Sequence, residues 1–66
     1  MAIIKLKEIR TQMNITLIEL EELSGISKSA LSRIERGEVS PTIYELERIA
    51  MALKINPYNL FKFTKN

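Results

Sequence analysis

The sequence predicts an all-α fold, a single compact domain of five short helices. Apolar residues recur at spacings of three and four along most of the chain, which is the period of one helix face. Residues that start and stop helices stand at each break in this pattern. No window alternates between apolar and polar residues, so we expect no strand. The 66 residues allow one domain, 1–66.

The first helix is expected over residues 3–13 and the second from about residue 16 to residue 24. The apolar stripe of the first comprises Ala2, Leu6, Ile9 and Met13. Asn14 follows it and tolerates the left-handed backbone that ends many helices. Thr16 and Glu19 have the spacing of a capping box, in which each side chain binds the other residue's backbone N–H. The second helix therefore begins at Thr16.

The third helix is expected from Ser27, a good N-cap, to Arg36, with Gly37 ending it. After a break at residues 40–41, Thr42 and Glu45 form a second capping box and begin the fourth helix. The inner face of the fourth helix comprises Leu46, Ile49, Ala50 and Leu53. A fifth helix is expected to begin at residues 56–57, where proline takes the first helical position, and to leave a tail at 62–66.

The composition argues against an enzyme. Cysteine and histidine are both absent, which removes thiolate ligands and the commonest general base. The glutamates of the second and fourth helices are expected to keep the protein soluble and to interact favourably with the positive ends of the helix dipoles. We therefore predict no catalytic residue, no metal or other cofactor and no small-molecule ligand. The start of the chain lacks signal-peptide features and no apolar run approaches about 20 residues, so we expect a cytoplasmic protein without a membrane partner.

The outer face of the third helix is the informative surface. At 100° per residue its polar side chains fall within an arc of about 140°. They are Lys28, Ser29, Ser32, Arg33 and Arg36, three cations and two hydroxyls. The alternative to a binding surface is a polar face that only contacts solvent, because the outer faces of amphipathic helices are commonly charged. The tight turn at Gly25 and the uniform sign of the charge favour double-stranded DNA as partner, in a chain of net charge +2.

The segment Leu6–Phe61 resembles the phage-repressor and Cro family of helix-turn-helix domains, also called the XRE family. The resemblance lies in an ungapped order of motif residues: Leu20, Ser24-Gly25-Ile26-Ser27, Leu31-Ser32-Arg33-Ile34-Glu35-Arg36-Gly37 and Pro41-Thr42. It implies a compact five-helix, lambda-repressor-like domain with its helix-turn-helix at about 16–36. It also implies binding to operator DNA, usually as a two-fold dimer.

The resemblance also implies roles for individual residues. Base-reading positions of the family correspond to Lys28, Ser29, Ser32 and Arg33. Phosphate-contacting positions correspond to Thr16, Ser40 and Thr42. Arg36 is interpreted as a further phosphate contact or as a solvated side chain, and the same two readings apply to Lys5 and Lys7.

Two further features follow from the resemblance. Arg10 and Glu35 match an ion pair that ties the first helix to the end of the third. Pro57, Tyr58 and Phe61 match a region often used for dimer contact. Phe63 lies past the last expected helix, and a dimer would cover it.

The chain departs from the family pattern at four positions. Leu17 replaces a glutamine that supports DNA contact. Glu21 stands on the second helix where a small residue is usual, which alters how this helix packs on the third. Asn14 and Lys54 stand where glycine is usual. A left-handed backbone at Lys54 would cost about 1 kcal/mol more than at glycine.

The sequence thus predicts a homodimeric transcriptional regulator, a repressor that binds a palindromic operator with the helix Ser27–Arg36 in the major groove. The alternative is a protein-interaction module of the same fold, an antitoxin or partner-binding subunit for which DNA is secondary. Its support is an apolar group on the second helix, comprising Leu17, Ile18 and Leu23.

Overall fold

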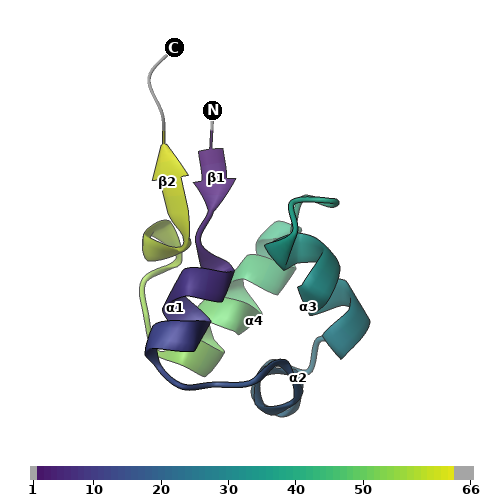
Figure 1. The fold of residues 1–66 in the computed structure, drawn as a ribbon. Coiled ribbons are helices and arrows are strands. Elements are labelled where there is room, and N and C mark those ends of the chain that lie inside the picture. Colours follow the sequence, from purple (N-terminus) through teal and green to yellow (C-terminus); the bar gives the residue numbers. More distant parts are fainter. Residues whose placement is uncertain (1, 64–66) are drawn as a thin grey trace.

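A computed structural model describes the backbone of residues 2–63 and the side chains of residues 4–61. Its elements in chain order are β1 (Ala2–Ile4), α1 (Leu6–Gln12), α2 (Leu17–Ser24), α3 (Lys28–Glu35), α4 (Ile43–Leu53), the 3₁₀ helix η1 (Pro57–Leu60) and β2 (Phe61–Phe63). The domain is therefore mainly helical. The small sheet lies beside α1 and η1, away from α2 (Figure 1).

The expected number of helices was wrong. The described residues form four α-helices, and the fifth expected helix is the single 3₁₀ turn η1. The side chain of Asn56 accepts a hydrogen bond from the Tyr58 backbone N–H at 2.9 Å, and Pro57 follows at the first helical position as expected. The backbone is already extended at Phe61, so the segment stops after one turn.

The expectation of no strand was also wrong. β1 pairs antiparallel with β2, with Ala2 opposite Phe63 and Ile4 opposite Phe61. Residues 62 and 63, expected in the tail, therefore belong to a strand that begins at Phe61, and α1 begins at Leu6 rather than at residue 3. Strands of three residues are too short to show a period of two, and the pairing joins opposite ends of the chain.

The core joins every helix of the described chain. Its buried apolar side chains are Leu6, Leu20, Ile26, Leu31, Ile34, Ile49, Ala50, Leu53 and Leu60. Full burial of one leucine or isoleucine side chain contributes about 1.5–3 kcal/mol. Leu31 and Ile34 supply the inner face of α3, so this helix is held rigidly while its other face stays free.

The boundaries of the central helices agree with the expected capping signals. Both capping boxes are present, Thr16 with Glu19 and Thr42 with Glu45. Ser27 caps α3, and its hydroxyl accepts from the Ala30 backbone N–H at 3.2 Å. Lys54 ends α4 in the left-handed conformation, at φ 58°.

Candidate nucleic-acid interface

The turn between α2 and α3 is fixed by short polar contacts. Gly25 ends α2 in the left-handed conformation, at φ 76°. The buried Ser24 hydroxyl accepts from the Ile26 backbone N–H at 3.1 Å. The carboxylate of Glu21 accepts from the Lys28 backbone N–H at 2.8 Å. α3 therefore starts with two of its free N–H groups already bound, one by Ser27 and one by Glu21.

The polar face of α3 lies opposite its core contacts. Its five residues, Lys28, Ser29, Ser32, Arg33 and Arg36, line one shallow depression on the surface. All except the half-buried Ser32 are exposed. Arginine can pair with guanine in bidentate fashion, and lysine and serine can donate to bases or phosphates. The depression therefore carries donors suited to an acidic, hydrogen-bonding polymer.

Arg36, on the polar face, has an acidic neighbour in the protein alone. Its Nε lies 2.7 Å from an oxygen of Glu38, and the two side chains are 59% and 52% exposed. An exposed pair of this kind contributes only about 0–1 kcal/mol. A phosphate can therefore replace Glu38 as the partner of Arg36 at little cost.

Thr16 and Thr42 stand at the starts of α2 and α4 with the same geometry. In each box the threonine N–H donates to the glutamate carboxylate at 2.9 Å, and the glutamate N–H donates to the threonine hydroxyl oxygen at 3.1 Å. Hydrogen bonds from Thr16 lower the pKa of Glu19. Each hydroxyl hydrogen remains available, because a hydroxyl both accepts and donates. Ser40 is exposed in the loop just before Thr42.

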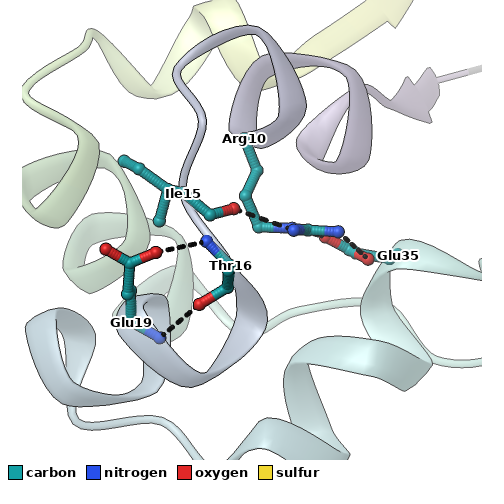
Figure 2. Close-up of polar contacts among 5 residues, drawn as sticks. All are labelled: Arg10, Ile15, Thr16, Glu19 and Glu35. Atoms are coloured by element: carbon teal, nitrogen blue, oxygen red, sulfur yellow. Dashed lines mark hydrogen bonds and ion pairs between the residues drawn. The ribbon is translucent and has the colours of Figure 1, made fainter.

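Arg10 connects three segments near the start of α2, as Figure 2 shows. Its Nε lies 2.6 Å from Glu35, at the end of α3, and its Nη2 donates to the second carboxylate oxygen at 3.3 Å. Its Nη1 donates to the Ile15 carbonyl at 2.8 Å, one residue before the Thr16 cap. The side chains of Arg10 and Glu35 are only 14% and 6% exposed. Arg10 thus positions the start of α2 against the end of α3.

Sequence reasoning missed two residues that hold the helix-turn-helix. Glu21 was interpreted as a residue for solubility and helix starts and as a departure from the family, yet it caps α3. Arg48 was not singled out, yet its Nε donates to the Ser24 carbonyl at 2.5 Å. The spacing of Tyr44 and Arg48 on α4 was the one local signal, since residues four apart are neighbours on a helix.

The residues expected at a dimer contact lie in η1 and β2. Pro57 and Tyr58 are exposed, Tyr58 to 79%, whereas Phe61 is half-buried and packs against the core. The side chain of Phe63 lies outside the described residues. On α2, Leu17 packs against the core, and Ile18 and Leu23 are 54% and 59% exposed.

Residues 2–63 contain neither a metal-binding cluster nor a membrane-spanning helix. No cluster of three or more acidic, histidine or cysteine side chains is suited to a metal ion in this part of the chain. Among the helices described, none has the length and apolar character needed to cross a membrane.

Comparison of the sequence and the fold with known proteins identifies the family of this chain. The profile of the helix-turn-helix family matches residues 6–60. The HTH-type transcriptional regulator SutR of Escherichia coli (strain K12) is 43% identical over 56 residues, which are 85% of this chain and 31% of SutR. The chain therefore spans about a third of the length of that relative.

Two solved structures share the fold. The restriction-modification controller protein C.AhdI from Aeromonas hydrophila superimposes with a TM-score of 0.81 and 34% identity, over 85% of each chain. The N-terminal DNA-binding domain of SinR from Bacillus subtilis has a TM-score of 0.78 and 35% identity, over 85% of this chain and 83% of that domain. The chain belongs to the helix-turn-helix family of the phage-repressor and Cro (XRE) type.

Proposed function

We propose that this protein is a sequence-specific regulator of transcription that binds double-stranded DNA with α3 in the major groove. The observation that carries the proposal is the polar face, on which three cations and two hydroxyls share one depression. The family supports it, since SutR is named as a transcriptional regulator and the SinR domain as DNA-binding. We expect such a regulator to act in the cytoplasm, together with the DNA that it binds.

The polar face divides by chemistry into base contacts and backbone contacts. Lys28, Ser29, Ser32 and Arg33 read base edges, with Arg33 the main determinant because guanidinium pairs well with guanine. Arg36 binds phosphate after leaving Glu38. Thr16, Ser40 and Thr42 donate their hydroxyl hydrogens to phosphates on either side, which fixes the register of α3 on the duplex.

The same proposal extends to assembly. Two copies bind a palindromic operator with their α3 helices about 34 Å apart, one turn of DNA. The exposed Pro57 and Tyr58 lie at the contact between the copies, and Phe61 and Phe63 of β2 belong to the same proposed contact. Binding of such a dimer to a promoter blocks transcription, so the regulator acts as a repressor.

Selection of binding sites from a random DNA pool tests the proposal. Wild-type protein should enrich a palindromic motif, and Arg33→Ala should lose preference at one base pair of each half-site, worth about 1–3 kcal/mol. Lys54→Gly is the matched control, because it removes one cation from the end of α4 and suits the left-handed backbone there. The proposal fails if wild-type protein enriches no motif, or if the control loses preference as Arg33→Ala does.

A protein-interaction module is the second candidate, and the exposed Ile18 and Leu23 on α2 favour it. Apolar side chains of this size on a small domain can mark a contact surface. Retention of a defined partner by wild-type protein, its loss in an Ile18→Ser, Leu23→Ser variant, and no enrichment of DNA would support this function in place of the first.

A further inference from the structure

Arg48 joins α4 to the turn of the helix-turn-helix. Its Nε donates to the Ser24 carbonyl, at the end of α2, at 2.5 Å. Its Nη1 donates to the Tyr44 hydroxyl at 2.9 Å, and its guanidinium carbon lies 5.4 Å from the centroid of the Tyr44 ring. The guanidinium is therefore held from both sides, by the turn and by its own helix.

The turn leaves room for this guanidinium by having glycine beside it. A Cβ added to Gly25 would lie 2.5 Å from Nη2 of Arg48. Gly25 thus meets two requirements, a left-handed backbone and the close approach of Arg48. Ser24, whose carbonyl accepts from Arg48, is itself buried. The hydrogen bond from Arg48 to the Ser24 carbonyl is therefore part-buried, whereas the one from Arg48 to Tyr44 lies at the surface.

The hydrogen bond between Arg48 and the Ser24 carbonyl lies where it can set the orientation of α3. The Ser24 carbonyl is one of the unpaired groups at the end of α2, where a cation is favourable. Residues 25–27 alone separate α2 from α3, so a rotation of the Ser24 peptide changes the tilt of α3. Base contacts tolerate only a few tenths of an ångström, because hydrogen bonds weaken outside 2.7–3.2 Å.

We propose that Arg48 is a positioning residue for DNA reading, which fixes the tilt of α3 through the Ser24 carbonyl, with Tyr44 holding its guanidinium in place. The inference rests on the proposed function and adds a specificity determinant outside α3. Loss of Arg48 lets α3 tilt, so that base contacts weaken while the cations that bind any DNA remain.

The experiment compares affinity for the motif selected by wild-type protein with affinity for unrelated DNA. The variants are Arg48→Met, which keeps the apolar stem, Arg48→Lys, which keeps the charge, and Tyr44→Phe, which keeps the ring. Thermal melts first establish the temperature at which each variant is folded. Arg48→Met should lose about tenfold in affinity for the motif, since one good base contact is worth that factor or more, with affinity for unrelated DNA unchanged.

The other variants separate positioning from direct contact. Tyr44→Phe should lower the ratio of motif affinity to unrelated-DNA affinity by a smaller factor than Arg48→Met does. Arg48→Lys should keep part of the ratio that Arg48→Met loses, because lysine can reach the Ser24 carbonyl. If Arg48 instead binds phosphate directly, both affinities fall together, the slope of log K against log salt drops by about 0.9, and Arg48→Lys restores them. That result would overturn the inference.

The ratio of motif affinity to unrelated-DNA affinity also shows whether this inference fails alone or together with the proposed function. If wild-type protein selects a motif and the folded Arg48→Met and Tyr44→Phe proteins keep its full ratio, Arg48 does not position α3 although the protein reads DNA. If wild-type protein selects no motif, the proposed function fails and this inference fails with it.

Discussion

Arg10 and Glu35 form a two-point ion pair across 25 residues of sequence, with 2.6 Å between Nε and Oε2. The pair joins α1 to the end of α3, and the same guanidinium binds the Ile15 carbonyl before α2. It also neutralises an acid that lies close in sequence to the polar face. A single side chain thereby holds three segments around the proposed DNA-binding surface.

Removal of Arg10 should destabilise the domain. Glu35 is nearly buried, and an uncompensated buried charge costs about 3–5 kcal/mol. We expect Arg10→Ala to lower the free energy of unfolding, measured by urea denaturation, by about 3 kcal/mol. Arg36→Ala is the control, because its ion pair with Glu38 is exposed and contributes about 1 kcal/mol or less. Equal effects of the two substitutions would contradict this account.

Release of Arg36 should strengthen DNA binding. Glu38→Gln removes the carboxylate that holds Arg36 in the free protein. The affinity for the selected motif should rise up to about fivefold at low salt, which corresponds to an exposed pair of about 1 kcal/mol. Titration with fluorescent DNA measures the change. Glu47→Gln on α4 alters the net charge equally, and a gain of the same size in that variant would show that net charge alone is responsible.

The capping box of α2 should contribute to acid sensitivity. Hydrogen bonds from Thr16 lower the pKa of Glu19 below its usual value of 4.5, so its carboxylate favours folding above pH 4.5. This contribution is lost as the pH falls below 4.5 through the lowered pKa.

Glu19→Gln keeps the geometry of a capping box but does not titrate. The stability of this variant, followed by thermal melts across that range, should therefore fall less steeply with acid than that of the wild type. An unchanged slope would show that Glu19 does not contribute to it.

The two glycines that end α3 and α2 should differ in their tolerance of alanine. Gly37 and Gly25 both have positive φ, 75° and 76°, so alanine pays about 1–2 kcal/mol of backbone strain at either. An added Cβ meets nothing within 4 Å at Gly37 but lies 2.5 Å from Arg48 at Gly25. Gly25→Ala should therefore be the more destabilising in thermal melts.

The difference should shrink when Arg48 is also replaced by alanine. In that background both glycine sites carry only the backbone strain, and the coupling between Gly25→Ala and Arg48→Ala measures the steric contact. Additive effects would mean that Arg48 moves aside without cost.

Much of the candidate site could be predicted because its signals are local. Ser27 caps α3 three residues before the N–H it binds, and the side chains of the polar face recur within three turns of one helix. The buried Leu31 and Ile34 mark the opposite face by the same periodicity. Capping and helical periodicity depend on residues only a few positions apart, so both can be recognised in the sequence without a structure.

The contacts that fix α3 in the domain were decided by the tertiary structure. The side chains of Glu21 and Arg48 bind backbone groups seven and 24 residues away. Each contact joins two different helices, so neither follows from the period of one helix. β1 and β2 pair segments near opposite ends of the chain. They form a sheet where the start of a helix and a tail were expected. The central helices and the chemistry of the polar face could be predicted without the structure, because both depend on neighbours along the chain. Only the folded chain decided the angle at which that face is presented, because that angle depends on residues brought together from separate helices.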